Sequence, residues 1–473
     1  MNNKLTDLPQ VIGVSPNAFS RVVPASFLEN YTVVCLKKRG ETEYAKHDAK
    51  VIVAEEEFPE DSKLTKQSTK AILEIPGVVS LVNSFKDPHI LIYKPLPALE
   101  KYCDQMGWKL IANRYELRDR LENKKNFREL LIKSGAVAIE GEIYQVENFI
   151  ESFYSELTSK FGEKLVFQIA EMTNGGGLGT SFINSLEDYK KFLLKLEELK
   201  KGETEIKHVN VTRFIEGIPA SVISIATEKG TITGTLQAQI QDIDLVNDPS
   251  KGSGLYCGHD WELLSGNDVI ISKAKDIAKK FGDYISKEIG YKGLFGMDVL
   301  VDLERNEVYP VECNPRYTDL FPIISMNCLD SGITPFDYYH ILSFIKPELI
   351  GDTEEISRGY KYLSPGSQLV LSTKSKFKTI MNGDLKAGVY KFDSEGNITF
   401  IRGGYRFEDM KDKDECLITE GVPFQGSTLG AYSRVARLVF KVGVLESKNK
   451  LKPLYENVVK NIYKLMDLSE VKQ

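Results

Sequence analysis

The sequence predicts an α/β (α+β) protein built from three parts. These are an N-terminal doubly wound parallel sheet, a central domain that carries the chemistry, and a C-terminal β-rich domain with a final helix. Three observations predict this: the chain of 473 residues is long enough for about three domains, strands alternate with helices at its start, and short β-like runs dominate its end. We place the domains at 1–115, 116–345 and 346–473.

Composition excludes several classes of protein. The chain has 61 Lys+Arg against 67 Asp+Glu, so it lacks the excess positive charge of a dedicated nucleic-acid binder. It has no apolar run of the roughly 18–20 residues that cross a bilayer, and its start lacks the apolar run of a signal peptide. Six scattered cysteines without a CxxC pair favour a reduced compartment. We therefore expect a cytoplasmic protein without nucleic-acid or membrane partners.

The N-terminal part reads as alternating strands and helices. Such a unit often binds a nucleotide, but it contains no GxGxxG, so we expect a packing role. The predicted strands are 31–36, 50–54, 89–93 and 109–112, with a helix at 98–106.

The central part combines long helices with strands. Residues 303–306 are polar and suit a hairpin turn between its last two strands. The predicted helices are Glu116–Ser134, Leu186–Lys201 and Asp268–Ile289, and the predicted strands are 164–169, 208–215, 221–227, 231–240, 296–302 and 307–312.

The C-terminal part begins with a short strand at 369–371. Two further strands, 388–392 and 398–402, are separated by a turn-forming segment that favours a β-hairpin. A helix over Leu454–Leu468, with apolar residues at helical spacing, closes the chain.

The strongest chemical signal lies on the last two central strands. Strand residues two apart share a face, so Asp298 points with Leu300, and Glu312 points with Asn314. If the strands pair, two carboxylates and an amide converge, a ligand set that suits Mg²⁺. Arg316 follows and can clamp an anionic oxygen. The alternative is that these polar residues only end their strands in solvent.

Three weaker signals accompany it. The loop Asn174–Thr180 is glycine-rich and lies between a strand and a helix, where it can cradle phosphate or serve as a mobile surface loop. It matches neither the P-loop nor the Rossmann pattern. The strand Val209–Gly217 ends in Glu-Gly, which alone reads as an ordinary strand and turn. Lys124 lies on a helix, where lysines are usually solvated.

In this order, the four pieces resemble the ATP-grasp superfamily over about Asn123–Pro322. The resemblance rests on Asn123-Lys124, the glycine-rich loop, the strand ending in Ile-Glu-Gly, and the pattern D…E-x-N-x-R. It implies an ATP-grasp fold that holds ATP between two α+β subdomains, with a lid at about 126–208. It also implies Mg²⁺, with Mn²⁺ as the alternative ion, and a homodimer as a common assembly.

The resemblance assigns roles residue by residue. Asp298, Glu312 and Asn314 look like the metal ligands, and Arg316 looks like the catalytic residue that steadies the transferring phosphoryl group. The backbone of 213–215 would face adenine. The implied ATP-binding residues are Lys124, Gln168, Gly175, Gly176, Gly177, Thr180, Arg213, Phe214, Ile215, Leu300 and Val311.

The chain departs from the family pattern at three places. Gln168 stands where a second phosphate-binding lysine is usual, and Pro219 and Ser221 stand where a ribose-binding glutamate is often found. Pro310 interrupts the second metal strand and is expected to restrict its pairing.

Enzymes of this type activate a carboxylate as an acyl phosphate, which an amine or thiol then attacks, releasing ADP and phosphate. We therefore predict an ADP-forming ligase acting on small-molecule carboxylates and amines. This chemistry needs no acid–base histidine, so His259 is expected to be structural.

Two other functions stay open. The three-part layout also resembles biotin carboxylase, although the usual Q-V-E after the arginine is replaced by Tyr317-Thr318-Asp319-Leu320. Gln168 alternatively suggests an ATP-binding regulator without catalysis. Substrate specificity is expected near Tyr317, Asp319 and the loop 252–259, and Arg402, Tyr405 and Arg406 are candidates to line a substrate pocket.

Overall fold

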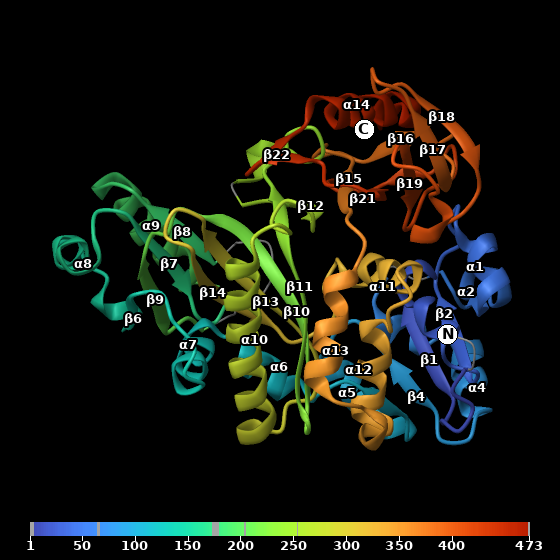
Figure 1. Ribbon diagram of the computed structural model, residues 1–473, viewed down its shortest axis with the longest axis horizontal. Coiled ribbons are helices and arrows are strands. Elements are labelled where there is room, and N and C mark those ends of the chain that lie inside the picture. Colours follow the sequence, from blue (N-terminus) through green and yellow to red (C-terminus); the bar gives the residue numbers. More distant parts are fainter. Residues whose placement is uncertain (1–3, 64–66, 173–178, 203–204, 253, 472–473) are drawn as a thin grey trace.

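The fold is described by a computed structural model of residues 4–63, 67–172, 179–202, 205–252 and 254–471. Three large sheets organise it: one in the N-terminal part, one in a lid that stands to one side, and one shared by the central and C-terminal parts (Figure 1). The predicted fold class is confirmed, with a parallel N-terminal sheet, a central antiparallel sheet and a β-rich C-terminal region.

The N-terminal sheet has five parallel strands in the order β3-β2-β1-β4-β5. Helices cover it, so β1 and β2 are buried along their whole length, as is usual for parallel sheets. Its elements are β1 (Val11–Ser15), β2 (Tyr31–Cys35), α1 (Thr42–Asp48), β3 (Lys50–Val53), α2 (Ala54–Glu57), α3 (Thr69–Leu73), α4 (Pro76–Asn83), β4 (His89–Leu91), α5 (Pro97–Met106) and β5 (Lys109–Ile111).

The central part provides five strands to a ten-stranded sheet with the order β14-β13-β10-β11-β12-β15-β21-β19-β17-β18. Its elements are α6 (Tyr115–Glu122), α7 (Lys124–Lys133), β10 (Ile218–Thr227), β11 (Gly230–Gln241), β12 (Tyr256–Asp260), α10 (Asp268–Ile289), β13 (Gly293–Asp302), β14 (Glu307–Asn314), α11 (Phe321–Asp330), α12 (Phe336–Ile345) and α13 (Thr353–Gly359).

The C-terminal part continues this same sheet, because β15 pairs with β12. The predicted hairpin is confirmed as β17 with β18, and the final helix ends two residues earlier than predicted. Its elements are β15 (Ser367–Ser372), β16 (Thr379–Met381), β17 (Gly388–Phe392), β18 (Ile398–Arg402), β19 (Glu415–Thr419), β20 (Thr428–Leu429), β21 (Arg434–Phe440), β22 (Leu445–Ser447), β23 (Lys450–Leu451), α14 (Pro453–Met466) and β24 (Leu468–Glu470).

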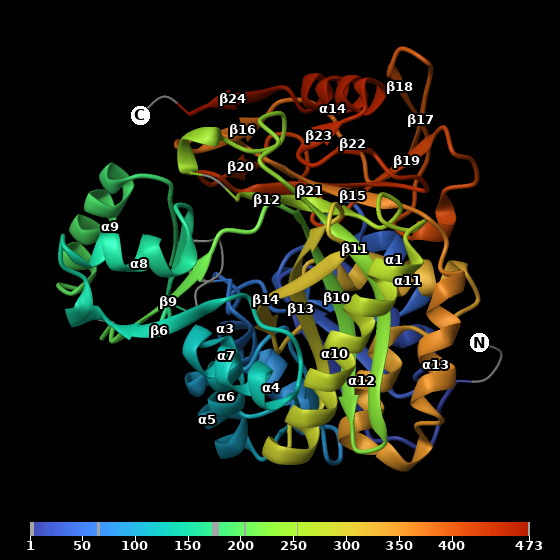
Figure 2. The same cartoon turned by 60° about the vertical axis from the view of Figure 1, so that its left-hand side comes forward.

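The two faces of the central sheet have different neighbours. Helix α10 lies along one face and buries Ile270, Ile277 and Phe281 against it (Figure 2). On the other face, Ile223 and Leu294 share a second apolar core with α11, α12 and the N-terminal part. Asp298 lies on this second face, since it is four residues from Leu294 along β13. The site therefore faces the N-terminal part.

The single helix predicted over Glu116–Ser134 is wrong, because the structure breaks it into α6 and α7. Asn123 leaves the helical conformation with φ −65° and ψ 122°. Its side chain accepts hydrogen bonds from the N–H groups of Lys125 and Asn126 at 3.1 and 3.2 Å. Asparagine is a favoured N-cap, and here it starts α7 at Lys124.

The lid is a four-stranded antiparallel sheet in the order β6-β9-β7-β8, with helices on one face. Alternate residues of β7 and β9, such as Phe167 and Val211, pack on those helices. The other face carries the polar residues Gln168 and Asn210. Its elements are β6 (Gly141–Gln145), α8 (Phe153–Phe161), β7 (Leu165–Ile169), β8 (Thr180–Ile183), α9 (Leu186–Leu199) and β9 (His208–Arg213).

No described helix is both long enough and apolar enough to cross a bilayer. The longest described helix, α10, has 22 residues and is amphipathic. Two ion pairs, Lys279 with Asp283 and Lys280 with Asp276, link successive turns of the helix.

Glu41 connects the N-terminal and C-terminal parts. Its side chain is fully buried and accepts hydrogen bonds from the N–H groups of Gly421 and Val422 at 2.6 and 3.2 Å. Burial raises the pKa of this carboxyl to about 7, despite the two backbone donors. A raised pKa in the folded protein means that this group favours folding at low pH and opposes it once ionised.

We expect wild-type stability to lose up to ~3 kcal/mol from this group as pH rises from near 4.5 through about 7. The neutral variant Glu41→Gln lacks this loss. Thermal denaturation at pH 5 and pH 8 should therefore show a smaller drop in Tm for the variant. Glu57→Gln, an exposed glutamate on α2, is the control and should keep the wild-type drop. Equal pH dependence in wild type and Glu41→Gln would contradict the assignment.

Candidate active site

The paired strands β13 and β14 bring the predicted metal ligands together. Asp298 lies directly opposite Glu312, and Gly296 lies opposite Asn314. The Asn314 side-chain amide donates to Asp298 Oδ2 at 3.1 Å and to Glu312 Oε1 at 3.3 Å. The two carboxylates and the amide thus form one cluster on the sheet face opposite α10.

A β-bulge shapes this cluster. The register shifts after the Asp298–Glu312 pair, so that Val299 pairs with Pro310 and Val311 is the extra residue. A bulge changes the direction of the side chains that follow it. Here the consecutive residues Val311 and Glu312 lie on the same side of the sheet. Pro310 lies beside this bulge and opposite Val299, in an edge strand, where prolines are tolerated within sheets.

Lys124 balances the carboxylates. Its ammonium contacts Glu312 Oε2, and its side chain keeps only 12% of its exposed area. Burial disfavours both carboxylate charges; the Lys124 charge outweighs this at Glu312 and lowers its pKa. Burial and the Glu312 charge together raise the pKa of Asp298. The Lys124 ammonium therefore offsets negative charge on the carboxylate pair.

The donor set fits a hard divalent cation. Two carboxylates and an amide oxygen are ligands that Mg²⁺ or Mn²⁺ accepts, with phosphate oxygens and water completing the shell. Asn314 turns its NH₂ toward the carboxylates and its Oδ1 toward Arg316, so ligation through Oδ1 requires the amide to rotate. Among the described residues, no third acidic, histidine or cysteine side chain joins the pair.

Arg316 is held from three directions. Its Nε donates to Glu122 at 3.1 Å, one terminal nitrogen donates to the Tyr93 hydroxyl at 3.2 Å, and the other donates to Asn314 Oδ1 at 2.8 Å. Glu122 is itself buried and lies 3.3 Å from Arg118 Nε. The guanidinium is therefore fixed beside the carboxylates before any ligand arrives.

An apolar patch lies next to the cluster, at the hinge between lid and central sheet. Ile215, Tyr309 and Ile139 form its buried part, and Leu300 and Val311 pack against them. Three of the residues implied for the adenine site are thus brought together. Flat apolar surface of this kind suits the faces of a purine ring.

Part of the backbone of residues 213–215 is hydrogen-bonded within the lid. The N–H groups of Arg213 and Phe214 donate to the carbonyls of Glu140 and Lys164 at 3.0 and 2.9 Å. The Arg213 guanidinium lies over the Tyr309 ring. In the described part of the chain, the N–H of Ile215 donates to no protein group.

The lid carries a neutral side-chain pair at the position where the family pattern predicts a lysine. Gln168 and Asn210 are cross-strand neighbours, and Asn210 Nδ2 donates to Gln168 Oε1 at 3.1 Å. Thr180 lies opposite Gln168 on the other side, in β8. The end of β7 contacts the start of α7, because the N–H of Lys124 donates to Ala170 O at 3.2 Å. The predicted Gly175, Gly176 and Gly177 lie outside the described residues.

His259 is structural, as expected. It is 4% exposed, its ring nitrogens lie 2.9 Å from the Tyr256 hydroxyl and 3.4 Å from Ser221 Oγ, and burial lowers its pKa to about 3. A histidine that stays neutral in a closed hydrogen-bonded setting is a poor proton carrier at neutral pH.

The candidate pocket residues of the C-terminal part have their described partners away from the carboxylate cluster. Arg402 pairs with Glu415 inside its own part, while Tyr405 and Arg406 reach Asp48 of the N-terminal part. Among the described residues, none of these contacts involves Arg316 or the two carboxylates. Position in the sequence had suggested a substrate-lining role that their partners do not support.

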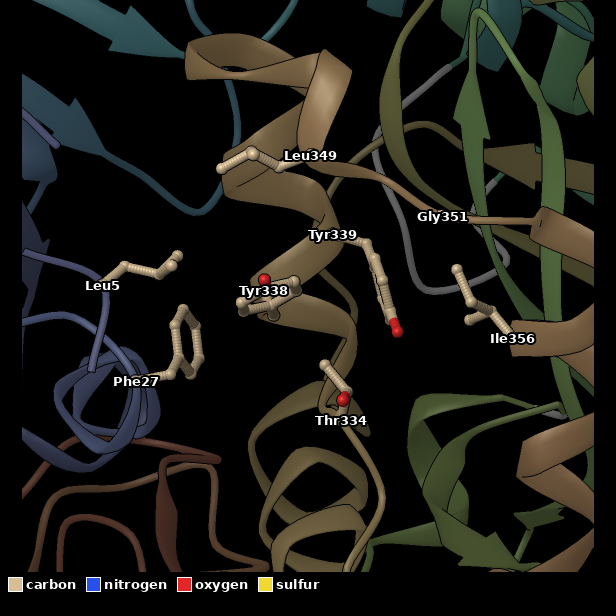
Figure 3. A pocket seen from close by; sticks show the side chains of 8 residues that line it. All are labelled: Leu5, Phe27, Thr334, Tyr338, Tyr339, Leu349, Gly351 and Ile356. Atoms are coloured by element: carbon tan, nitrogen blue, oxygen red, sulfur yellow. The ribbon is translucent and has the colours of Figure 1, made fainter. Parts of the chain in front are cut away.

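A separate cavity of about 290 Å³ lies away from the cluster (Figure 3). Its lining is mostly apolar and comes from the N-terminal segment, α12 and the loop before α13. It contains none of the predicted site residues, so we do not assign it to the chemistry. Its main lining residues are Leu5, Phe27, Tyr338, Tyr339, Leu349 and Ile356.

Sequence reasoning missed several residues of the cluster. Tyr93 and Glu122 hold Arg316, yet they lie 223 and 194 residues away from it in the chain. No local pattern marks such partners. Asn210 was missed as well, although a polar residue between two valines of a buried strand is a usable signal.

Comparison with known proteins agrees with this geometry. Residues 189–319 match the model of the ATP-grasp domain family. No curated protein sequence matches the chain.

Solved structures share its three-part fold. Biotin carboxylase from Campylobacter jejuni is 15% identical with a TM-score of 0.60, covering 91% of this chain and 87% of its own. The biotin carboxylase domain of Hydrogenobacter thermophilus 2-oxoglutarate carboxylase is 13% identical with a TM-score of 0.58, covering 98% and 92%. N5-carboxyaminoimidazole synthase from Aspergillus clavatus is 13% identical with a TM-score of 0.53, covering 97% and 98%. Residues 189–319 are thus similar to the ATP-grasp domain family, and the whole chain shares the fold of biotin carboxylase.

Proposed function

We propose that this protein is an ATP-dependent, ADP-forming ligase that activates a carboxylate as an acyl phosphate and joins it to an amine or thiol. The observation that carries the proposal is the cluster of Asp298, Glu312, Lys124 and Arg316 beside an apolar patch. It offers a metal site, a phosphate-binding cation and a fixed guanidinium within one region. The ATP-grasp family match and the folds of the solved neighbours support the same class.

Each residue has a stated task in this proposal. Asp298, Glu312 and Asn314 would hold Mg²⁺, which supplies charge neutralisation at the terminal phosphates. Lys124 would exchange Glu312 for a phosphate oxygen. Arg316 would stabilise the charge that develops on the transferring phosphoryl group, and its fixed position lowers the reorganisation needed.

The base would lie on the hinge patch. Leu300 and Val311 would cover one face of the ring, and the N–H of Ile215 would donate to the edge of the base. Gln168 and Asn210 would supply hydrogen bonds from the lid without charge. We expect nucleotide binding to survive the loss of the usual lysine, because Lys124 and Arg316 retain two cations near the phosphates.

Finer features belong to the same proposal. Mg²⁺ is the expected ion with Mn²⁺ as substitute, and the neighbours were solved with nucleotides that include ADP and MgADP. The Hydrogenobacter thermophilus domain was solved as a dimer, which supports a homodimer here. We propose a cytoplasmic protein; light scattering tests the dimer and cell fractionation tests the location.

The Glu312→Gln variant tests the ligase directly. In the presence of ATP, Mg²⁺ and pooled carboxylates and amines, wild type should release phosphate. Glu312→Gln removes a metal ligand and the partner of Lys124, so we expect release to fall at least ~100-fold. Glu307→Gln lies on the same strand, pairs with Lys273 at the surface, and should keep wild-type release.

Other results identify the rival functions. Unchanged turnover in Glu312→Gln would overturn the metal assignment. Phosphate release that depends on bicarbonate and biotin would indicate a carboxylase. ADP binding by calorimetry without turnover in any pool would indicate a regulator.

Glu122 provides a second test, through Arg316. Glu122→Ala leaves the buried guanidinium of Arg118 and the partly buried guanidinium of Arg316 without their shared carboxylate. Removing one partner of a buried ion pair typically costs ~3–5 kcal/mol, so we expect a clearly lower midpoint in urea unfolding. Glu116→Ala, on the exposed side of the same helix, should change the midpoint little. Equal midpoints for the two variants would show that the pairing of Glu122 with the two arginines does not stabilise the fold.

A further inference from the structure

A second pair of opposite charges lies close to Arg316. Asp319 follows Arg316 by three residues, and its carboxylate contacts the guanidinium of Arg434, which starts β21 of the C-terminal part. Burial raises the pKa of the Tyr93 phenol, and the charges of Arg316, Asp319 and Arg434 all act on it. Tyr93 also receives a hydrogen bond from Arg316. The pair and Arg316 therefore share one neighbourhood.

The pair is accessible, whereas the groups behind it are not. The side chains of Arg434 and Asp319 keep 35% and 29% of their exposed area. Glu420 lies behind Arg434 at 3.4 Å and is 7% exposed, and the Arg437 guanidinium that pairs with Glu420 is fully buried. Glu420 is thus already compensated by Arg437. Glu420 contacts Arg434 on its buried side, and Asp319 contacts it on its partly exposed side.

Charge balance selects the ligand that can replace this pair. A lone carboxylate on Arg434 would leave Asp319 beside a second negative charge, and a lone ammonium on Asp319 would leave Arg434 without a partner. A ligand with both groups satisfies both side chains at once. Guanidinium binds carboxylate in a two-pronged geometry, and a carboxylate accepts strongly from an ammonium.

We propose that Arg434 and Asp319 form the recognition site for a zwitterionic amine substrate, an α-amino acid, with its carboxylate on Arg434 and its amino group on Asp319. The inference rests on the proposed ligase function and assigns its amine substrate. It places the amino group on the Arg316 side, where the activated carboxylate would form. Arg434 begins β21, which the ten-stranded sheet joins to the central part through β15 and β12.

The test measures binding, which does not depend on turnover. Wild type saturated with ADP and Mg²⁺ is titrated by calorimetry with each of the protein L-amino acids. For any amino acid that binds, the matched amide, which lacks the carboxylate, and the matched deaminated acid, which lacks the ammonium, are titrated too. We expect both analogues to bind ~10- to 100-fold more weakly.

Variants locate the site. Arg434→Gln and Asp319→Asn should each weaken amino-acid binding ~10- to 100-fold and leave ADP affinity unchanged. Arg434→Lys keeps the charge but not the two-pronged geometry, so it should also bind the amino acid more weakly. Because it keeps the charge, it is the variant in which a folding defect is least expected. Lys391→Gln, which loses an exposed ion pair with Asp414 in the same part, is the matched control and should behave as wild type.

The outcomes separate the two proposals. Wild type that binds ADP but no amino acid, or charge variants that bind the amino acid as tightly as wild type, would overturn this inference and leave the ligase proposal standing. Wild type that binds no ADP would overturn the ligase proposal, on which this inference depends.

Discussion

The antiparallel pairing of β13 with β14 is the constraint on which the site depends. It places Asp298 opposite Glu312. Because of the bulge at Val311, this apolar residue and the following Glu312 lie on the same side of the sheet. A regular strand would point them to opposite faces. Because β14 is the edge strand, the bulge and Pro310 are tolerated where a central strand would lose its ladder. The apolar patch and the charged cluster are thus adjacent by backbone geometry.

Arg316 makes the site dependent on all three parts of the chain. Tyr93 comes from the N-terminal part, Glu122 from the end of α6, and Asn314 from β14. Asp319, three residues after Arg316, pairs with Arg434 of the C-terminal part. The ten-stranded sheet connects the central and C-terminal strands without interruption, so these groups are held in one frame. Fixed dipoles and charges of this kind stabilise developing charge without reorganising.

Much of this could be predicted from sequence, for physical reasons. The convergence of Asp298, Glu312 and Asn314 could be predicted, because strand alternation and the short turn between the strands determine which residues are neighbours. The helix 268–289 was predicted with the bounds that the structure shows, since its apolar period and its C-terminal glycine are strong signals. The break at Asn123 was missed because both flanking segments favour helix, and only the capping geometry separates them.

The remainder depends on contacts between distant segments. Glu122 and Tyr93 reach Arg316 through tertiary packing that no periodicity encodes. Position alone points to Arg402 and Tyr405, whereas Arg434, which pairs with Asp319, begins a strand whose other residues are buried core. The pairing of β12 with β15 also joins the central and C-terminal parts, which the sequence pattern alone divides into two domains.

The most direct test of the account is a crystal structure of the protein with ADP and Mn²⁺, read by the anomalous signal of the ion. The account predicts one ion bound by Asp298 and Glu312, with Asn314 turned so that its oxygen completes the protein ligands and Lys124 moved from Glu312 to a phosphate. An ion held by other residues, or a nucleotide bound away from Leu300 and Val311, would contradict it.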